Sequence, residues 1–190
     1  MVALEPDYFR ALETPRMATL SPNLVAAAFP LMKLMPARYI LDRAAADGAL
    51  QTGGRIVETT SGTFGMALAL LAAARGYRLT LVTASSLIDA KYRARLEGLG
   101  ARMIITEDPD GNGDQLRRLQ RLEGIRREEP DCFWPRQSDN PGNALAYARL
   151  AELLVRTVGK IDCLVGGVGS GGRCAAQGRF CARSFRTLSS

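Results

Sequence analysis

Short apolar runs alternate with longer segments of helical period along most of this chain, and this alternation constrains its fold more than any other feature. The expected strands are residues 55–58, 78–83, 101–106 and 161–165, and the expected helices are residues 64–75, 87–99, 114–129 and 143–157. Helices placed between nearly continuous apolar strands predict an α/β protein with a doubly wound parallel sheet. Ligands bind at the carboxyl ends of such strands, so we expect functional residues in the loops that follow them.

Composition excludes several classes of protein. The chain has 190 residues, 47% of them hydrophobic, which suits one globular domain or two small ones rather than a disordered or fibrous protein. It contains no apolar run of about eighteen residues and no basic segment leading into an apolar core, so we expect a soluble, unexported, cytoplasmic protein without a membrane partner.

Metal and nucleophile chemistry is limited by the residue types present. The chain has no histidine, and its cysteines form no C-x-x-C pair; they are Cys132, Cys163, Cys174 and Cys181. This excludes the usual zinc sites and the Ser/His and Cys/His nucleophiles, so no metal is expected. The cysteines are expected to be reduced structural thiols.

The net charge of +6 is concentrated at the end of the sequence. No acidic residue follows Asp162, and four arginines lie in the segment 173–190. Without these four, the chain carries 21 basic against 19 acidic residues. Basic and aromatic residues are not interleaved in the manner that stacks nucleic-acid bases, so we expect no nucleic-acid partner.

Lys33 stands out because it is one of only three lysines and lies within the apolar run 29–36. Burial lowers the pKa of a lysine toward the range in which the free amine attacks a carbonyl carbon and forms a Schiff base. The alternative is a surface lysine whose aliphatic stem lies along an apolar patch while its ammonium group stays in water.

Two loops after expected strands carry unusual residues. Residues 59–65 read Thr-Thr-Ser-Gly-Thr-Phe-Gly and lead into a helix whose N-terminal N–H groups suit a carboxylate. The alternative is an ordinary helix N-cap by Ser61 or Thr63. Residues 166–172 read Gly-Gly-Val-Gly-Ser-Gly-Gly and suit a nest of N–H donors around a phosphate, with a simple turn as the alternative.

Four motifs in this order resemble the fold-type II pyridoxal-phosphate enzymes of the cysteine synthase and cystathionine β-synthase family. They are Leu-Met-Lys-Leu-Met-Pro-Ala around Lys33, Thr-Ser-Gly-Thr-Phe-Gly at 60–65, Gln-Ser-Asp-Asn-Pro-Gly-Asn at 137–143 and Gly-Val-Gly-Ser-Gly-Gly at 167–172. The resemblance extends from Thr14 to Gly172. It implies a tryptophan synthase β-like fold of two doubly wound parallel-sheet domains, the second of them incomplete in this chain.

The resemblance also implies the chemistry. The cofactor would be pyridoxal 5'-phosphate, held by Lys33 as an internal aldimine, and Lys33 would also remove the substrate's α-proton. The substrate carboxylate would be bound by Thr60, Ser61, Gly62, Thr63 and Gln137. The cofactor would also contact Thr63, and its phosphate would be bound by Gly167, Gly169, Ser170, Gly171 and Gly172. The implied reaction is β-replacement or β-elimination on an amino acid, such as addition of sulfide to an activated serine, in a homodimer.

The family pattern implies four segments in this chain. They are residues 1–40 as the start of a large domain, 41–143 as a small domain, 144–172 as the resumption of the large domain, and 173–190 as an aberrant, disordered tail. Family members extend well beyond the phosphate loop, whereas the periodic apolar pattern is lost after Gly172. We expect either a frameshift near codon 172 or a natural truncation, and an enzyme impaired by it.

The chain departs from the family pattern within the motifs. Leu34-Met35 stand where the family has Asp-Arg, Thr63 stands where it has Asn, and Phe64 replaces a small residue. Thr63 is shorter than Asn and has no amide donor. These departures leave the cofactor assignment intact, but they leave the particular amino acid and nucleophile open.

Two other functions fit parts of the sequence. Gly167-x-Gly169-x-x-Gly172 after an apolar strand matches the dinucleotide-binding fingerprint, which would make this a nicotinamide-binding module. That fingerprint needs a following helix, a second strand and an acidic residue, and the residues after Gly172 supply none of them. The remaining alternative is an inactive fragment that only associates with a full-length partner.

Overall fold

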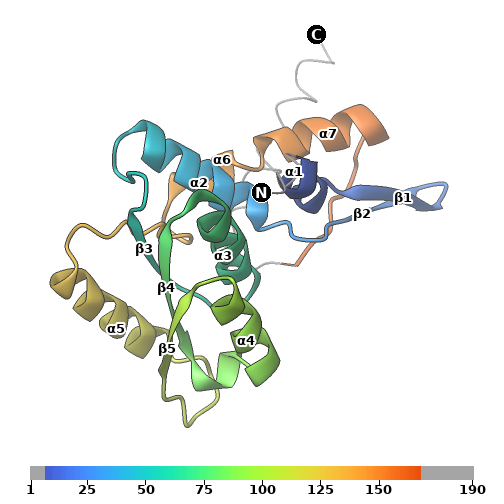
Figure 1. Ribbon diagram of the computed structural model, residues 1–190. Coiled ribbons are helices and arrows are strands. Elements are labelled where there is room, and N and C mark those ends of the chain that lie inside the picture. The colour runs from blue at the N-terminus through green and yellow to red at the C-terminus, as the bar shows by residue number, and fades with distance from the viewer. Residues whose placement is uncertain (1–6, 168–190) are drawn as a thin grey trace. The chain divides into compact units, whose positions relative to one another are not determined.

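The computed structural model describes residues 7–167, and these fall into two compact units (Figure 1). One unit, here called the sheet unit, comprises Leu41–Arg136. The other, here called the terminal unit, combines the residues up to Ile40 with those from Gln137 onward.

The sheet unit is built on a parallel sheet of three strands in the order β3 (Arg55–Thr59), β4 (Arg78–Ala84) and β5 (Arg102–Thr106). In its register, Ile56 lies opposite Leu79 and Leu81 lies opposite Met103. An isolated parallel bridge between Ile56 and Phe133 extends the sheet on the outer edge of β3. The expected α/β class with a parallel sheet is therefore confirmed.

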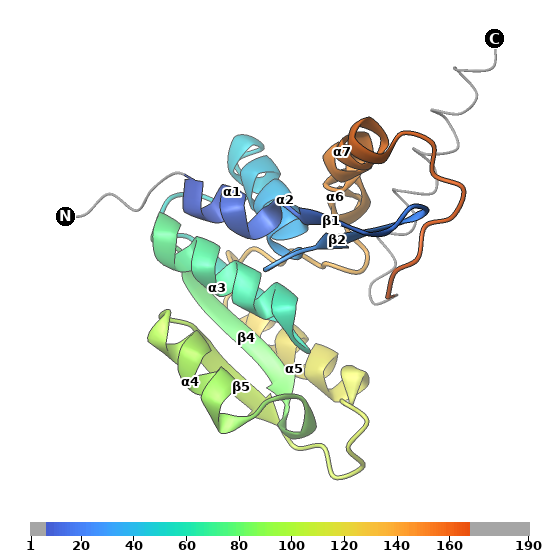
Figure 2. The same ribbon diagram turned by 90° about the vertical axis from the view of Figure 1, so that its right-hand side faces the viewer.

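Helices cover both faces of this sheet, as a doubly wound arrangement requires. Figures 1 and 2 show α3 (Thr63–Arg75) and α4 (Ala90–Gly98) on one face and α5 (Gln115–Glu128) on the other. A short 3-10 turn, η1 (Ser85–Leu87), links β4 to α4. The chain thus crosses over through a helix after each strand, which is how parallel strands are connected.

The core of the sheet unit explains why these segments take these forms. Val57 and Val82 are buried against Leu122 and Ile125 of α5. On α3 the buried residues are mostly small, which lets this helix lie close to the sheet; they are Phe64, Gly65, Ala67, Leu68, Ala69, Leu71 and Ala72. The helix ends at Gly76, whose left-handed backbone (φ 70) donates its N–H to the carbonyl of Ala72.

The terminal unit contains helices and an antiparallel hairpin. Its elements are α1 (Asp7–Glu13), β1 (Arg16–Ser21), β2 (Leu24–Ala28), the start of α2 (Leu34–Ala46), α6 (Pro141–Leu145) and α7 (Ala148–Val158). Its core is the buried cluster of Tyr147, Leu150 and Leu154. Side chains that pack on this cluster come from both halves of the unit: Met17, Ala27, Phe29, Met32, Met35 and Ile161.

Several predicted elements differ from the observed ones. The three strands of the sheet are confirmed to within one residue at each end, whereas no element before residue 55 was predicted. The helix expected over 87–99 begins only at Ala90, because the Asp89 side chain accepts the N–H of Tyr92 and caps it. The helix expected over 143–157 is divided into α6 and α7.

The strand expected at residues 161–165 is wrong. This segment forms no strand, and Leu164 and Val165 are 46% and 89% exposed. A strand needs a hydrogen-bonding neighbour, and within residues 7–167 no segment pairs with this one. Among the same residues, no helix has the length and apolar character needed to cross a membrane. The expected tail, residues 173–190, lies outside the described residues.

Candidate functional site

Thr60 organises the loop that follows β3. Its own N–H donates to the carbonyl of Val82 at 2.9 Å, which ties the start of the loop to β4. Its buried hydroxyl Oγ1 accepts the N–H groups of Gly62 at 3.2 Å and Gly65 at 3.1 Å, and donates to the carbonyl of Gly62 at 3.1 Å. One hydroxyl therefore closes the loop against the first turn of α3.

Gly65 is required at this point by close packing. A Cβ atom at Gly65 would lie 2.6 Å from Oγ1 and 2.8 Å from Cγ2 of Thr60. A residue larger than glycine fits at position 65 only if Thr60 moves. The Thr-x-x-x-x-Gly spacing of residues 60 and 65 is thus a steric match between the loop and the helix it precedes.

The first turn of α3 is not capped by a side chain in the usual way. Its N-cap residue is Gly62, which has no side chain to accept a hydrogen bond, so the alternative of an ordinary cap by Ser61 or Thr63 is wrong. The side chains of Ser61 and Thr63 are exposed. The helix therefore starts with N–H groups and two hydroxyls at the carboxyl end of β3, which is the chemistry of an anion site.

A tyrosine from α4 also contacts this loop. The hydroxyl of Tyr92 donates to the carbonyl of Gly62 at 2.8 Å. Burial raises the pKa of Tyr92 above its ordinary value, and a hydrogen bond with the backbone of Met66 acts in the opposite direction. Sequence reasoning missed Tyr92, because a single tyrosine on a charged helix carries no motif.

Lys33 lies in the turn immediately before α2, in the terminal unit. Its side chain is half-buried, between the buried Leu31 and Leu34 in sequence. Its carbonyl accepts the N–H of Ala37 at 3.2 Å, so the residue stands at the start of the helix. The neighbouring Met32 and Met35 pack on the Tyr147 cluster, which holds the lysine's backbone in an apolar setting.

Gln137 and Gly167 also belong to the terminal unit. Gln137 is half-buried in the turn before α6, and Gly167 is exposed. The remaining predicted phosphate-loop residues lie outside the described part of the chain; they are Gly169, Ser170, Gly171 and Gly172. The structure thus brings Thr60, Ser61, Gly62 and Thr63 together in one loop, and describes Lys33, Gln137 and Gly167 within the other unit.

A buried carboxylate lies next to the Thr60 loop. Glu58 is 2% exposed, and its Oε1 accepts the N–H of Thr59 at 2.8 Å and the indole Nε1–H of Trp134 at 2.9 Å. These bonds join the end of β3 to the segment after α5. The sequence signal for Glu58 is a lone acidic residue inside an apolar strand, and this pattern alone predicts no role for it.

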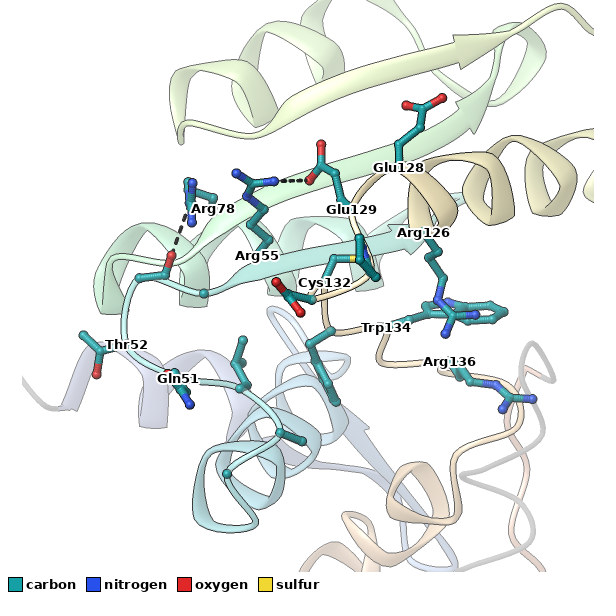
Figure 3. A pocket seen from close by; sticks show the side chains of 18 residues that line it. Gln51, Thr52, Arg55, Arg78, Arg126, Glu128, Glu129, Cys132, Trp134 and Arg136 are labelled. Atoms are coloured by element: carbon teal, nitrogen blue, oxygen red, sulfur yellow. Dashed lines mark hydrogen bonds and ion pairs between the residues drawn. The ribbon is translucent and has the colours of Figure 1, made fainter.

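A pocket of about 950 Å³ lies at the opposite end of the sheet (Figure 3). It is formed by the loop before β3 and the segment after α5, at the amino ends of β3 and β4, and it shares no residue with the Thr60 loop. Arg55 and Glu129 form an ion pair across it at 3.0 Å. Arg126 and Arg136 each lie 5.1 Å from the centre of the Trp134 ring.

Two of the arginines around this pocket have partners among its own lining residues. Besides the Arg55–Glu129 pair, Arg78 donates through Nε to the carbonyl of Gly53 at 3.2 Å. Burial raises the pKa of the Cys132 thiol, so this cysteine is not an activated nucleophile. No group of side chains among residues 7–167 is arranged to hold a metal ion.

Comparison with known proteins gives the family. The family model described as "Pyridoxal-phosphate dependent enzyme" matches residues 32–188. The chain belongs to this family. The matched range begins beside Lys33, includes the Thr60 loop, and continues through most of the segment 173–190 that the sequence analysis expected to be aberrant.

Individual relatives agree with this membership. Cysteine synthase A of Escherichia coli is 35% identical over 136 residues, which cover 70% of this chain and 41% of that protein. Cystathionine beta-synthase of Apis mellifera is 37% identical over 134 residues, covering 70% of this chain and 26% of that protein. The chain therefore spans less than half the length of these relatives, and the family resemblance inferred from the motifs is confirmed.

A solved structure shows the same fold. The hydrogen sulfide-producing enzyme Fn1220 of Fusobacterium nucleatum superposes with a TM-score of 0.84 at 20% identity, covering 97% of this chain and 63% of that one. The family's cofactor is pyridoxal phosphate. The described residues fit this cofactor in their chemistry, because Lys33 supplies a half-buried amine for an aldehyde carbon and the start of α3 supplies N–H and hydroxyl groups for an anion.

Proposed function

We propose that this protein carries out β-replacement or β-elimination on an amino acid with pyridoxal phosphate, as a lyase or transferase related to cysteine synthase. The observation that carries the proposal is the Thr60 loop, an anion-binding helix start at the carboxyl end of a parallel sheet. The family match supports it, and so do the printed names of the relatives, since both curated relatives are synthases of sulfur amino acids by name.

The Thr60 loop would bind the substrate carboxylate. At the start of α3 the Gly65 N–H is taken up by Thr60 and Gly62, and the N–H groups of Thr63 and Phe64 precede it in the first turn, where the helix dipole places partial positive charge. The exposed hydroxyls of Ser61 and Thr63 add two further donors. Gln137, at the start of the second half of the terminal unit, is proposed as another carboxylate ligand on the strength of its motif.

Lys33 would hold the cofactor through its amine and then move a proton at the α-carbon of the substrate. The bound cofactor supplies an acceptor for the negative charge that develops at this carbon. Lys33 is half-buried, and the neighbouring Met32 and Met35 pack on the Tyr147 cluster, which fixes the turn that carries it. Gly167 and the glycines that follow it are proposed to bind the cofactor phosphate.

The two proposed reactions give different products, so they can be told apart by measurement. In β-replacement the substituent on the β-carbon leaves with its electron pair and a nucleophile such as sulfide takes its place. In β-elimination the substituent and the α-proton leave together, and hydrolysis of the product yields pyruvate and ammonium. A homodimer, expected from the resemblance, and a cytoplasmic location, expected from the composition, stay predictions.

Borohydride labelling of the 190-residue chain tests the cofactor assignment. The chain is incubated with pyridoxal phosphate, reduced and digested, and the labelled peptide is identified by mass spectrometry. We expect the label on Lys33 and its loss in Lys33→Arg, while Lys91→Arg keeps it. Lys160 is a poor competitor, because its hydrogen bond with Asp162 raises the pKa of its amine.

Other labelling outcomes decide between the alternatives. A label on Lys91 or Lys160 instead of Lys33 contradicts the assignment. Binding of a nicotinamide dinucleotide without any label favours the dinucleotide-binding alternative, although residues 161–165 do not form the strand which that fingerprint requires. If neither a labelled lysine nor dinucleotide binding is found, the inactive-fragment alternative is favoured. Pyruvate release from β-chloro-L-alanine then tests turnover.

A further inference from the structure

The carbonyl of Gly62 accepts three hydrogen bonds in the Thr60 loop. It accepts the N–H of Gly65 at 3.0 Å, the hydroxyl of Thr60 at 3.1 Å and the hydroxyl of Tyr92 at 2.8 Å. The first two donors belong to the loop and its helix. Tyr92 is the only one of the three that comes from a distant part of the chain, thirty residues further on.

The direction of this carbonyl fixes the direction of the next N–H group. The described residues contain no cis peptide bond, and in a trans peptide the carbonyl and the following N–H point in opposite directions. The N–H that follows the Gly62 carbonyl is that of Thr63, the first residue of α3. Three donors on the Gly62 carbonyl therefore aim the Thr63 N–H away from Thr60 and Tyr92.

Tyr92 is itself held at both ends. Its N–H donates to Oδ1 of Asp89 at 2.7 Å, which fixes its backbone at the start of α4. Its ring is half-buried, and its hydroxyl contacts both the Gly62 carbonyl and the backbone of Met66. A rigid aromatic side chain thus spans from α4 to the first turn of α3.

We propose that Tyr92 is a positioning residue for the carboxylate-binding loop, acting through the Gly62 carbonyl to orient the Thr63 N–H. This inference rests on the proposed function, because it gives the loop a carboxylate ligand. Thr60 is tied to β4 through its own N–H, but the three bonds of its hydroxyl all stay within the loop and the first turn of α3. Tyr92 adds a reference point outside that segment.

Tyr92→Phe tests this by removing one oxygen and keeping the ring. The matched control is Tyr77→Phe, also a half-buried tyrosine of the sheet unit, whose hydroxyl makes no hydrogen bond to the described residues. NMR signals of the Gly62 carbonyl carbon and the Thr63 amide are followed in the 190-residue chain. Acetate serves as the carboxylate probe.

We expect the Gly62 carbonyl signal to move in Tyr92→Phe and not in Tyr77→Phe. Acetate should shift the Thr63 amide of the wild-type chain, and Tyr92→Phe should weaken that apparent affinity about three- to tenfold, the usual effect of one hydrogen bond. An unchanged acetate affinity in Tyr92→Phe, or no response of Thr63 in the wild type, overturns the proposal.

A second substitution keeps the test independent of folding. Fluorotyrosine introduced only at position 92 keeps the ring and the hydroxyl but donates more strongly, so it should move the Gly62 carbonyl signal opposite to Tyr92→Phe. A shift in the same direction contradicts the role of the hydroxyl. The proposed function is judged separately by labelling of Lys33, which does not depend on Tyr92: absence of that label with a normal Tyr92 effect refutes only the cofactor assignment.

Discussion

Strand β4 and the segment 161–165 have the same apolar signature but different structures. β4 lies between β3 and β5, and its residues Leu81 and Val82 are fully buried. The segment 161–165 has no ladder partner among the described residues, and Leu164 is 46% exposed. The difference teaches that an apolar run becomes a strand only where hydrogen-bonding neighbours and a covering layer reach it.

The largest contrast is expected between two identical substitutions. Leu81→Ala removes a fully buried side chain from the centre of the sheet and should lower the free energy of unfolding by about 2–5 kcal/mol. Leu164→Ala should change it by less than about 0.5 kcal/mol, because that side chain is half exposed. Urea unfolding followed by circular dichroism measures both, and equal effects would show that residues 161–165 pack as firmly as β4.

A second contrast concerns two glycines in the helices of the sheet unit. Gly65→Ala places a Cβ against Thr60 and should destabilise the chain by about 1–3 kcal/mol. Gly98→Ala, at the end of α4, meets open space and should stabilise it by about 0.5 kcal/mol. Thermal unfolding shows whether each substitution lowers or raises the unfolding midpoint. A neutral Gly65→Ala would mean that the Thr60 loop adapts, and would weaken the steric account of this site.

The buried end of β3 gives a third, smaller effect. Glu58→Gln replaces the carboxyl group that accepts the Trp134 indole N–H by an amide and should cost about 1 kcal/mol. Trp134 is the only tryptophan of the chain, so its fluorescence reports this change directly. Glu97→Gln is the matched control, since it breaks an exposed pair with Arg93 and should leave the emission unaltered. Unchanged emission in both variants would contradict the Glu58–Trp134 bond.

The smallest expected effect is a dependence of stability on alkaline pH. The pKa of Tyr92 is raised on folding, mainly by burial, so the folded chain keeps the phenol proton to higher pH than the unfolded chain. Its contribution to stability is complete below the ordinary tyrosine pKa of about 10 and is lost as pH rises through the folded-state pKa. The wild type should therefore lose stability relative to Tyr92→Phe above about pH 10. Parallel pH curves of the unfolding midpoint would contradict this.

The elements that the sequence predicts well are those in which the apolar pattern is long. The three sheet strands and α3 were predictable because their apolar periods are long and end at glycines or polar residues. The β1–β2 hairpin was not, since its residues are mostly exposed or half-buried and show no alternation strong enough to identify it. The break between α6 and α7 was also hidden, because both halves continue one apolar pattern.

The residues of the candidate site also differ in how well the sequence predicts them. Lys33, the residues Thr60–Thr63 and the family itself followed from short motifs, because the order of residue types along the chain is all that a motif requires. The roles of Tyr92, Glu58 and Trp134 did not, because each acts across thirty or more residues of sequence.

The sequence alone therefore determined the α/β class, the family and the positions of the chemical groups. Only the tertiary structure decided that Gly62 rather than Ser61 caps α3, that Gly65 is in contact with Thr60, and that residues 161–165 have no strand partner among residues 7–167. The physical reason is that helix and strand periods are local properties of a chain. Hydrogen bonds and steric contacts between distant segments depend on where folding places them.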